Sequence, residues 1–148
     1  MTITKWNEQH PLTTKEQIEL TDFLYTHLQE YGDAREDIDS CLNYAMNRIS
    51  DRPTSGTVFS AYVQDELAGV AVVNETGMKD YIPENILVYI ATHSDYRGRG
   101  IASSLMKEVI GSCKGNIALH VEHDNPAKRL YEKLGFTNKY SEMRLIKK

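Results

Sequence analysis

The first third of the chain has the hydrophobic pattern of a helix. Between residues 15 and 31 the apolar side chains recur every three or four positions, which predicts one amphipathic helix over this range. Thr14 and Gln17 fit the pattern of a capping box at its start. Gly32 is the predicted stop, because glycine adopts the left-handed conformation that commonly ends a helix.

An acidic and polar stretch over residues 33–39 interrupts this pattern and predicts a connection between two helices. Apolar side chains resume at Cys41 and predict a second helix. This helix is expected to end before Arg52-Pro53, since a residue that precedes proline disfavours helical backbone.

The remainder of the chain alternates between strand and helix patterns. Two runs rich in β-branched residues, 57–63 and 67–73, flank a three-residue turn and predict an antiparallel hairpin. Gly69 inside the second run predicts a bulge. The other predicted elements are a first strand over 2–6, a central strand over 86–91, a helix over 100–112, a strand over 116–121, a helix over 125–134 stopped by Gly135, and a final pair of strands across 136–140 and 143–146. This order predicts an α/β fold.

Composition narrows the class of protein. With 148 residues, 41% of them hydrophobic, the chain is expected to form one domain over 1–148. A net charge of −4 argues against nucleic acid as a partner, because nucleic-acid binding requires a basic surface. Cys41 and Cys113 have no metal-ligand spacing, the N-terminus is polar, and no apolar run is long enough to cross a membrane. These features predict a cytoplasmic protein.

The most informative stretch is the apolar run that precedes the turn Arg97-Gly98-Arg99-Gly100. Glycines allow close backbone approach, a helix N-terminus carries partial positive charge, and arginine offers bidentate donors, so the turn is suited to bind a polyphosphate. The Gly-Lys-Ser/Thr of a P-loop is absent. A dinucleotide fingerprint matches only in part, because Ser103 replaces its third glycine and too little chain follows for the remaining strands. Glu122 lies where that fingerprint would place its acidic residue.

The turn with its continuation, Arg97-Gly98-Arg99-Gly100-Ile101-Ala102, resembles the Arg/Gln-x-x-Gly-x-Gly/Ala signature of the GNAT superfamily of acyl-CoA N-acyltransferases. A second block that resembles the family follows this turn at the spacing that the family has. It comprises the strand pattern 117–121 and the segment 125–136, which ends in Leu-Tyr-Glu-Lys-Leu-Gly-Phe. The match covers residues 86–136 and implies a single-domain GNAT-like fold with a mixed, mostly antiparallel sheet flanked by helices.

The resemblance also implies roles for individual residues. Backbone amides of the turn, with Arg97 beside them, are expected to hold the pyrophosphate of acetyl-CoA. A backbone N–H near Ile90 is expected to stabilise the oxyanion, and Thr92 to contact the pantetheine arm. Tyr131 is the expected proton donor to the leaving thiolate, although packing into the core is the commoner fate of a helical tyrosine. The complete expected cofactor-binding set is Ile90, Thr92, Arg97, Gly98, Arg99, Gly100, Ile101, Ala102 and Asn125, where Asn125 could equally act as a helix N-cap.

The base that would deprotonate the amine remains open at this point. The central strand lacks the glutamate that some family members place there. Glu75, Glu84, His120 and Glu122 are the candidates, acting directly or through water. His93 and His123 form no metal-binding pattern, so no metal is expected.

By the same resemblance, the segment 29–39 is expected to border the acceptor site. Five carboxylates against the single Arg35 would focus a negative potential there and favour a cationic acceptor, unless the segment is only a solvated loop. These carboxylates are Glu30, Asp33, Glu36, Asp37 and Asp39.

The sequence thus predicts an N-acetyltransferase that moves acetyl from acetyl-CoA to a primary amine by direct attack, without a covalent enzyme intermediate. The acceptor is a small molecule or a peptide, and a homodimer is left open. The alternatives are a non-catalytic acyl-CoA-binding module and, less favoured, a dinucleotide-binding domain.

Overall fold

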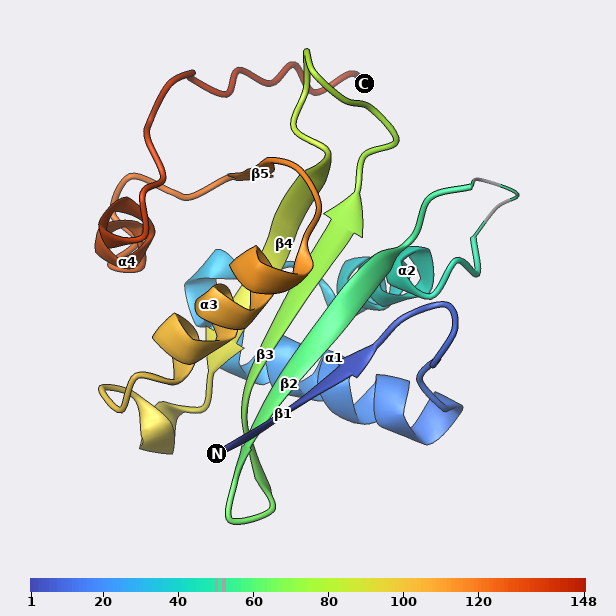
Figure 1. Ribbon diagram of the computed structural model, residues 1–148, viewed down its shortest axis with the longest axis vertical. Coiled ribbons are helices and arrows are strands. Elements are labelled where there is room, and N and C mark those ends of the chain that lie inside the picture. The colour runs from blue at the N-terminus through green and yellow to red at the C-terminus, as the bar shows by residue number, and fades with distance from the viewer. Residues whose placement is uncertain (50, 52) are drawn as a thin grey trace.

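A five-stranded sheet forms the centre of the protein (Figure 1). The structure is a computed structural model, and it describes residues 1–49, 51 and 53–148. The strands lie in chain order, and neighbouring strands are antiparallel except for the parallel pair β4–β5. Their bounds are β1 Thr2–Trp6, β2 Gly56–Val63, β3 Glu66–Glu75, β4 Asn85–Thr92 and β5 Ile117–Leu119. The prediction of a mixed, mostly antiparallel sheet is confirmed.

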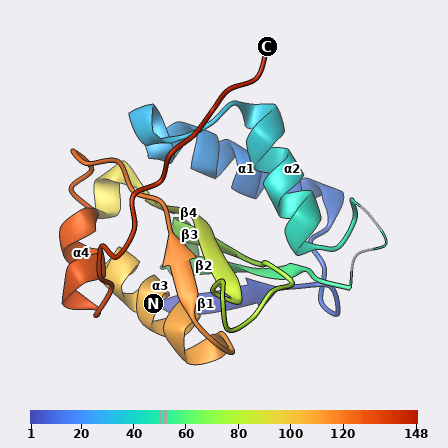
Figure 2. The ribbon, with the colours of Figure 1, turned by 90° about the horizontal axis from the view of Figure 1, so that it is seen from above.

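Helices cover both faces of this sheet. Seen from above, α1 (Thr14–Leu28) and α2 (Arg35–Ala45) lie on one face (Figure 2). On the other face lie α3 (Ile101–Ser112) and α4 (Lys128–Lys133). Among the described residues no helix is both long and apolar enough to cross a membrane.

The strands divide their side chains between two hydrophobic cores, as the period of two along a strand requires. Val58 and Val72 face α1 and α2, where they join Leu24 and Leu42 in one buried cluster. Phe59, Ala71 and Leu87 point the opposite way and pack with Leu105 and Met106 of α3 and with Tyr131 of α4. Because β2 and β3 are covered on both faces, their sequences are apolar almost throughout.

The β2–β3 hairpin forms as predicted, but its turn has two residues instead of three, because Glu66 already pairs with Val63. Gln64 and Asp65 have φ values of 50° and 64°, as a two-residue hairpin turn requires. The predicted bulge also forms, since Ala68 is the extra residue between the pairs Gly69–Ala61 and Leu67–Tyr62. Gly69 has a further reason to be small: a Cβ there would lie 2.7 Å from Ile101 Cγ2 at the start of α3.

The start of α1 corrects the predicted capping box by one residue. Thr13 Oγ1 accepts from the Glu16 backbone N–H at 3.1 Å, and Glu16 Oε1 accepts from the Thr13 N–H at 2.9 Å. Gln17 is buried instead and donates to Asp39 and Asn43 of α2. A carboxylate makes the stronger acceptor in this motif, and that leaves the glutamine free to connect the two helices.

The connection between α1 and α2 was predicted incorrectly. Helix α1 ends at Leu28, followed by the 3-10 turn η1 (Gln29–Tyr31), so Gly32 is not its stop. Gly32 has a φ of −99°, and a Cβ there would approach Leu28 Cβ to 2.8 Å. Helix α2 begins at Arg35, within the stretch expected to be a loop, because Glu36 and Asp37 suit the positive end of a helix. Helix α2 ends at Ala45, earlier than its predicted end before Arg52, because Asn47 adopts a left-handed φ of 57°. Arg52 itself lies outside the described residues.

The C-terminal part departs furthest from the sequence pattern. Strand β5 is shorter than predicted. Helix α4 begins three residues after Asn125, its predicted start, because Pro126 restricts the residue before it to extended backbone. The two predicted strands within 136–148 do not form in the described chain (Figure 1). Their alternating side chains lack a neighbouring strand, and Met143 and Leu145 stay 92% and 85% exposed.

Candidate functional site

The candidate site is built around the point where β4 and β5 separate. Their parallel pairing runs from Asn85–Ile117 to Leu87–Leu119 and then stops. On its other side β4 continues to pair with β3 as far as Thr92, with a bulge at Val88. The edge of β4 beyond Leu87 therefore carries backbone groups that have no strand partner within the described residues. Ile90 and Thr92, predicted to contact the cofactor, lie on this stretch.

The glycine turn follows β4 and leads into α3. Gly98 and Gly100 have φ values of 78° and 79°, a conformation that favours glycine. A Cβ added to either would meet no atom within 4 Å, so the space beside each glycine is open. The first intrahelical acceptor of α3 is the Gly100 carbonyl, which leaves the amides of Ile101 and Ala102 without helical partners. Open backbone donors at a helix N-terminus suit a pyrophosphate.

The two arginines of the turn have different surroundings. Arg97 Nη2 donates to the His27 carbonyl at 3.2 Å, which ties the turn to the last residues of α1. The guanidinium of Arg99 lies over the Tyr96 ring, 5.2 Å from its centroid. Both side chains are exposed, so both can also reach a bound anion.

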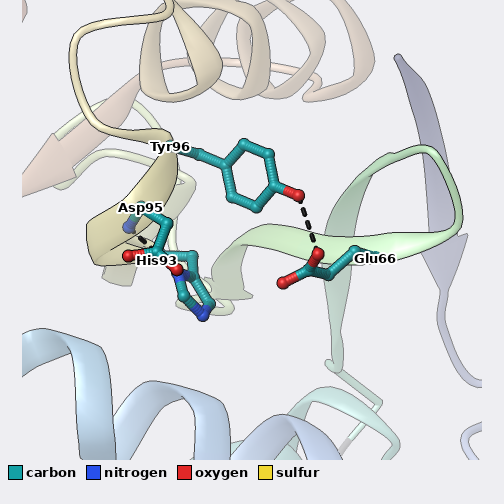
Figure 3. Close-up of polar contacts among 4 residues, drawn as sticks. All are labelled: Glu66, His93, Asp95 and Tyr96. Atoms are coloured by element: carbon teal, nitrogen blue, oxygen red, sulfur yellow. Dashed lines mark hydrogen bonds and ion pairs between the residues drawn. The ribbon is translucent and has the colours of Figure 1, made fainter.

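The residues just before the turn hold it in place (Figure 3). His93 Nδ1 accepts from the Asp95 backbone N–H at 3.0 Å and caps the 3-10 turn η2 (Ser94–Tyr96). The Tyr96 hydroxyl donates to Glu66 Oε2 of β3 at 2.8 Å. These contacts fix the direction in which the chain leaves the sheet.

His27 connects this turn to the helix α1. Its ring lies 4.3 Å from the ring of His93 and 4.5 Å from that of Phe23. Burial lowers the pKa of His27, and the neighbouring His93 and Arg97 lower it further. The neutral imidazole packs with its aromatic neighbours rather than adding charge to the turn.

Tyr131 lies on α4 and is 7% exposed, packed edge-to-face on Phe136 with the ring centroids 5.9 Å apart. Burial raises its pKa to about 12. No hydrogen bond from its hydroxyl to another described residue is found, and its oxygen is not among the buried polar atoms that lack a partner, so the hydroxyl lies at the edge of the core. The sequence left a packing role and a catalytic role open, and the structure shows a packed ring with an unpaired hydroxyl.

Asn125 has a local structural role. Its Oδ1 accepts from the Ala127 N–H at 2.9 Å, so it shapes the turn that leads to α4 without being the residue that caps the helix. Phe136 N donates to the Tyr131 carbonyl at 3.0 Å, and Gly135 between them has a φ of 103°. Gly135 therefore stops the helix as predicted.

The four candidate bases lie in two different places. Glu75 and Glu84 flank the beginning of β4, where β4 and β5 are still paired. The carboxylate of Glu84 accepts from the Asn116 N–H at 2.7 Å and from the Asp80 N–H, and these bonds lower its pKa. His120 and Glu122 are exposed residues that follow β5, beyond the point of separation.

We call the stretch beyond Leu87, where β4 no longer pairs with β5, the opening. Two residues that the sequence did not single out together are joined beside it. Tyr89 points from β4 toward α1 and α2, and its hydroxyl donates to Asp33 Oδ2 at 2.5 Å. Fifty-six positions separate the two residues, so no local pattern could have paired them. Among the described residues no group of three or more histidine, cysteine, aspartate or glutamate side chains is placed to hold a metal ion.

Comparisons with known proteins agree with this geometry. A family model described as an acetyltransferase (GNAT) domain matches residues 54–138. The cysteine-rich protein 2-binding protein of Mus musculus is 37% identical over 54 residues, which are 36% of this chain and 7% of that protein. This chain therefore spans a small part of the curated relatives it matches.

Solved structures resemble the whole chain at low identity. Ribosomal-protein-alanine N-acetyltransferase from Brucella melitensis biovar Abortus 2308 has a TM-score of 0.67 and 17% identity, with 98% of this chain and 97% of that one covered. An aminoglycoside N-acetyltransferase in complex with CoA has a TM-score of 0.63 and 18% identity, with 99% of each chain covered. At these identities the likeness shows a shared fold.

Proposed function

We propose that this chain, which belongs to the GNAT acetyltransferase family, is an acyltransferase that moves acetyl from acetyl-CoA to a primary amine. The amine attacks the thioester directly, without an acyl-enzyme intermediate. Cys41 offers no alternative nucleophile, since burial raises the pKa of its thiol to about 12. We further propose that residues 1–148 act as one domain in the cytoplasm.

The observation that carries this proposal is the open turn at the N-terminus of α3. The space beside Gly98 and Gly100 is free of other atoms, and the amides that follow have no helical partner. We assign the pyrophosphate of acetyl-CoA to the amides from Gly98 to Ala102, with Arg97 and Arg99 adding charge. Acetyl-CoA supplies a thioester, whose carbonyl carbon accepts the amine and whose sulfur leaves.

The unpaired edge of β4 positions the reacting group. A backbone N–H near Ile90 donates to the oxygen on which charge develops, and Thr92 contacts the pantetheine arm. Tyr131 donates its hydroxyl proton toward the sulfur as the carbon–sulfur bond breaks. Its ring is held by Phe136, and its hydroxyl has no competing partner among the described residues. Asn125 shapes the loop beside it.

The amine must lose a proton before it attacks. Of the four predicted bases, His120 and Glu122 follow β5 at the opening, whereas Glu84 is engaged by backbone N–H groups and Glu75 lies at the far end of β4. We therefore propose that the proton leaves through water beside His120 or Glu122.

The acceptor is proposed to be cationic. Two proteins that share the fold are named for the alanine of a ribosomal protein and for aminoglycosides, which are peptide and small-molecule amines. Of the five carboxylates predicted to favour such an acceptor, Glu36, Asp37 and Asp39 belong to α2, and Asp33 of the α1–α2 connection accepts from the Tyr89 hydroxyl of β4.

Two measurements test the proposal. Release of free thiol from acetyl-CoA is followed with a panel of primary amines, and turnover with at least one of them is expected. Thermal shifts are compared for acetyl-CoA, NAD and ATP, and only acetyl-CoA is expected to stabilise the protein. Stabilisation by acetyl-CoA with no thiol release from any amine would identify a non-catalytic acyl-CoA-binding module. Stabilisation by NAD alone would identify a dinucleotide-binding domain.

A further inference from the structure

We propose that the cavity between the sheet and the C-terminal end of α3 binds a free α-amino acid with an apolar side chain. The cavity has a volume of about 220 Å³ and is lined by β2, β3 and the first residue of β4 on one side and by residues 112–114 on the other. The glycine turn leads into the opposite, N-terminal end of α3 (Figure 1). The inference therefore concerns a second site and does not depend on the proposed function.

The floor of the cavity is apolar. Phe59 and Val73 line it, and both belong to the buried cluster that joins the sheet to α3. An apolar group of a ligand is stabilised when it leaves water and packs against such a floor. The cavity is smaller than the roughly 300 Å³ at which sites for drug-sized ligands begin. The ligand is therefore a small molecule with an apolar part.

Asn85 supplies a hydrogen-bond acceptor in the wall of the cavity. Its side chain lines the cavity and is 5% exposed. The Nδ2 group donates to the Lys114 carbonyl at 2.7 Å and to the Asn116 carbonyl at 3.2 Å, and these two acceptors fix which side-chain atom is the nitrogen. Within the described residues Oδ1 accepts no hydrogen bond, although it is not closed off from solvent. A buried acceptor of this kind needs an N–H or O–H donor from the cavity.

Two opposite charges lie at the cavity without pairing with each other. Glu75 of β3 is close enough to Cys113 that its charge, after burial, raises the pKa of that thiol. Lys114 lines the cavity from the segment that follows α3. Neither side chain has an ion-pair partner in the part of the chain that the structure describes. Both are exposed, so each can turn toward a ligand.

These groups match the three parts of an apolar α-amino acid. Its ammonium group carries three N–H donors, for which Asn85 Oδ1 and Glu75 are the acceptors. Its carboxylate pairs with Lys114, and its side chain packs on the apolar floor. A simple amine would lie beside the like charge of Lys114, and a simple carboxylate would lie beside that of Glu75. A zwitterion satisfies both charges at once.

Calorimetric titration tests the class of ligand. The probes are L-valine, L-leucine and L-phenylalanine, which differ in size and share both charged groups, and at least one is expected to bind. The tightest is then compared with the amine that lacks only its carboxylate and with the acid that lacks only its ammonium group. Each should bind on the order of 10-fold more weakly than the amino acid. Binding of none of the three amino acids, or equal binding of the amino acid and either counterpart, overturns the inference.

Two variants remove one charge each from the cavity. In Lys114→Gln the amino acid should lose its advantage over the matched amine, and in Glu75→Gln its advantage over the matched acid. Lys107→Gln removes a lysine charge from an exposed position of α3 that does not line the cavity, and it should change neither ratio. An amino-acid affinity that is unchanged in both cavity variants would place the binding elsewhere and overturn the inference.

Cys113 reports whether the cavity itself is occupied. Its half-buried thiol lines the cavity, whereas the Cys41 thiol accepts from Asn74 Nδ2 at a different place. Alkylation of each cysteine by iodoacetamide is followed by peptide mass spectrometry. At roughly ten times its dissociation constant the amino acid should slow alkylation of Cys113 on the order of 10-fold and leave Cys41 unchanged, because only the free cavity admits the reagent. An amino acid that binds without protecting Cys113 refutes the location. None of these measurements uses acetyl-CoA, so their outcome is independent of the proposed function.

Discussion

Removing the hydroxyl of Tyr131 tests the proposed chemistry most directly. The ring is 7% exposed and packs on Phe136, whereas the hydroxyl has no described hydrogen-bond partner. Tyr131→Phe keeps the packing and removes only the proton donor. Because no hydrogen bond is lost, the free energy of unfolding should change by less than about 0.5 kcal/mol.

The expected effect on turnover follows from the pKa of this group. General acid catalysis contributes roughly 10² to 10⁴ in rate, and most when the pKa lies near the working pH. Burial raises the pKa of Tyr131 to about 12, which makes it a weaker acid than an ordinary tyrosine. We therefore expect the lower end of this range, a fall in kcat on the order of 10²-fold, with acetyl-CoA affinity unchanged.

The assay measures single-turnover acetylation per folded molecule together with urea unfolding. Tyr81→Phe removes the same hydroxyl from a side chain that is 78% exposed in the β3–β4 loop, and it should be neutral in both measurements. Unchanged kcat in Tyr131→Phe, or a loss explained entirely by unfolding, would refute the proton-donor role. In that case Tyr131 is a core residue of α4.

Three further predictions concern the turn, the sheet and the loop before β4. Gly100→Asp places a negative charge beside the bound pyrophosphate and should weaken acetyl-CoA binding, measured by calorimetry, on the order of 10²-fold more than the isosteric Gly100→Asn does. Equal acetyl-CoA affinities of the two variants would contradict the assignment. Gly69→Val pushes against Ile101 Cγ2, 2.7 Å from the added Cβ, and should lower the free energy of unfolding by about 1–3 kcal/mol in urea. Hydrogen bonds from backbone N–H groups, that of Asn116 first, lower the pKa of Glu84 below its ordinary 4.5. The stabilisation of the folded protein by these bonds is therefore complete above pH 4.5 and is lost as the pH falls through the lowered pKa. Urea midpoints of wild type and Glu84→Gln should therefore differ at pH 7 and converge in acid, and a constant difference would rule this out.

The sequence by itself determined the elements whose cause is local. The β-branched run before Arg97 is a strand, the paired glycines are a turn in the left-handed region, and the apolar period after Gly100 is helix α3. The β2–β3 hairpin was equally predictable, because Gln64 and Asp65 adopt the turn that joins two alternating runs. Together these elements fix the family signature, and the resemblance to GNAT acetyltransferases is confirmed by the match over residues 54–138.

The errors arose where two local patterns competed. Thr13 with Glu16 and Thr14 with Gln17 both fit a capping box, and the choice depended on the burial of Gln17 between α1 and α2. The acidic residues after Asp33 led to the prediction of a loop, although acidic side chains are also favourable in the first turn of a helix.

Only the tertiary structure decided where β5 stops and which residues meet at the opening. A strand persists only while a neighbour pairs with its backbone, so β5 ends at Leu119 where β4 diverges, and the alternating residues of the C-terminal segment form no strand. In the same way Tyr89 meets Asp33 because helices α1 and α2 fold over β4 and bring their connection to it. Periodicity records the face on which a side chain lies, whereas the partner across that face depends on how distant segments pack.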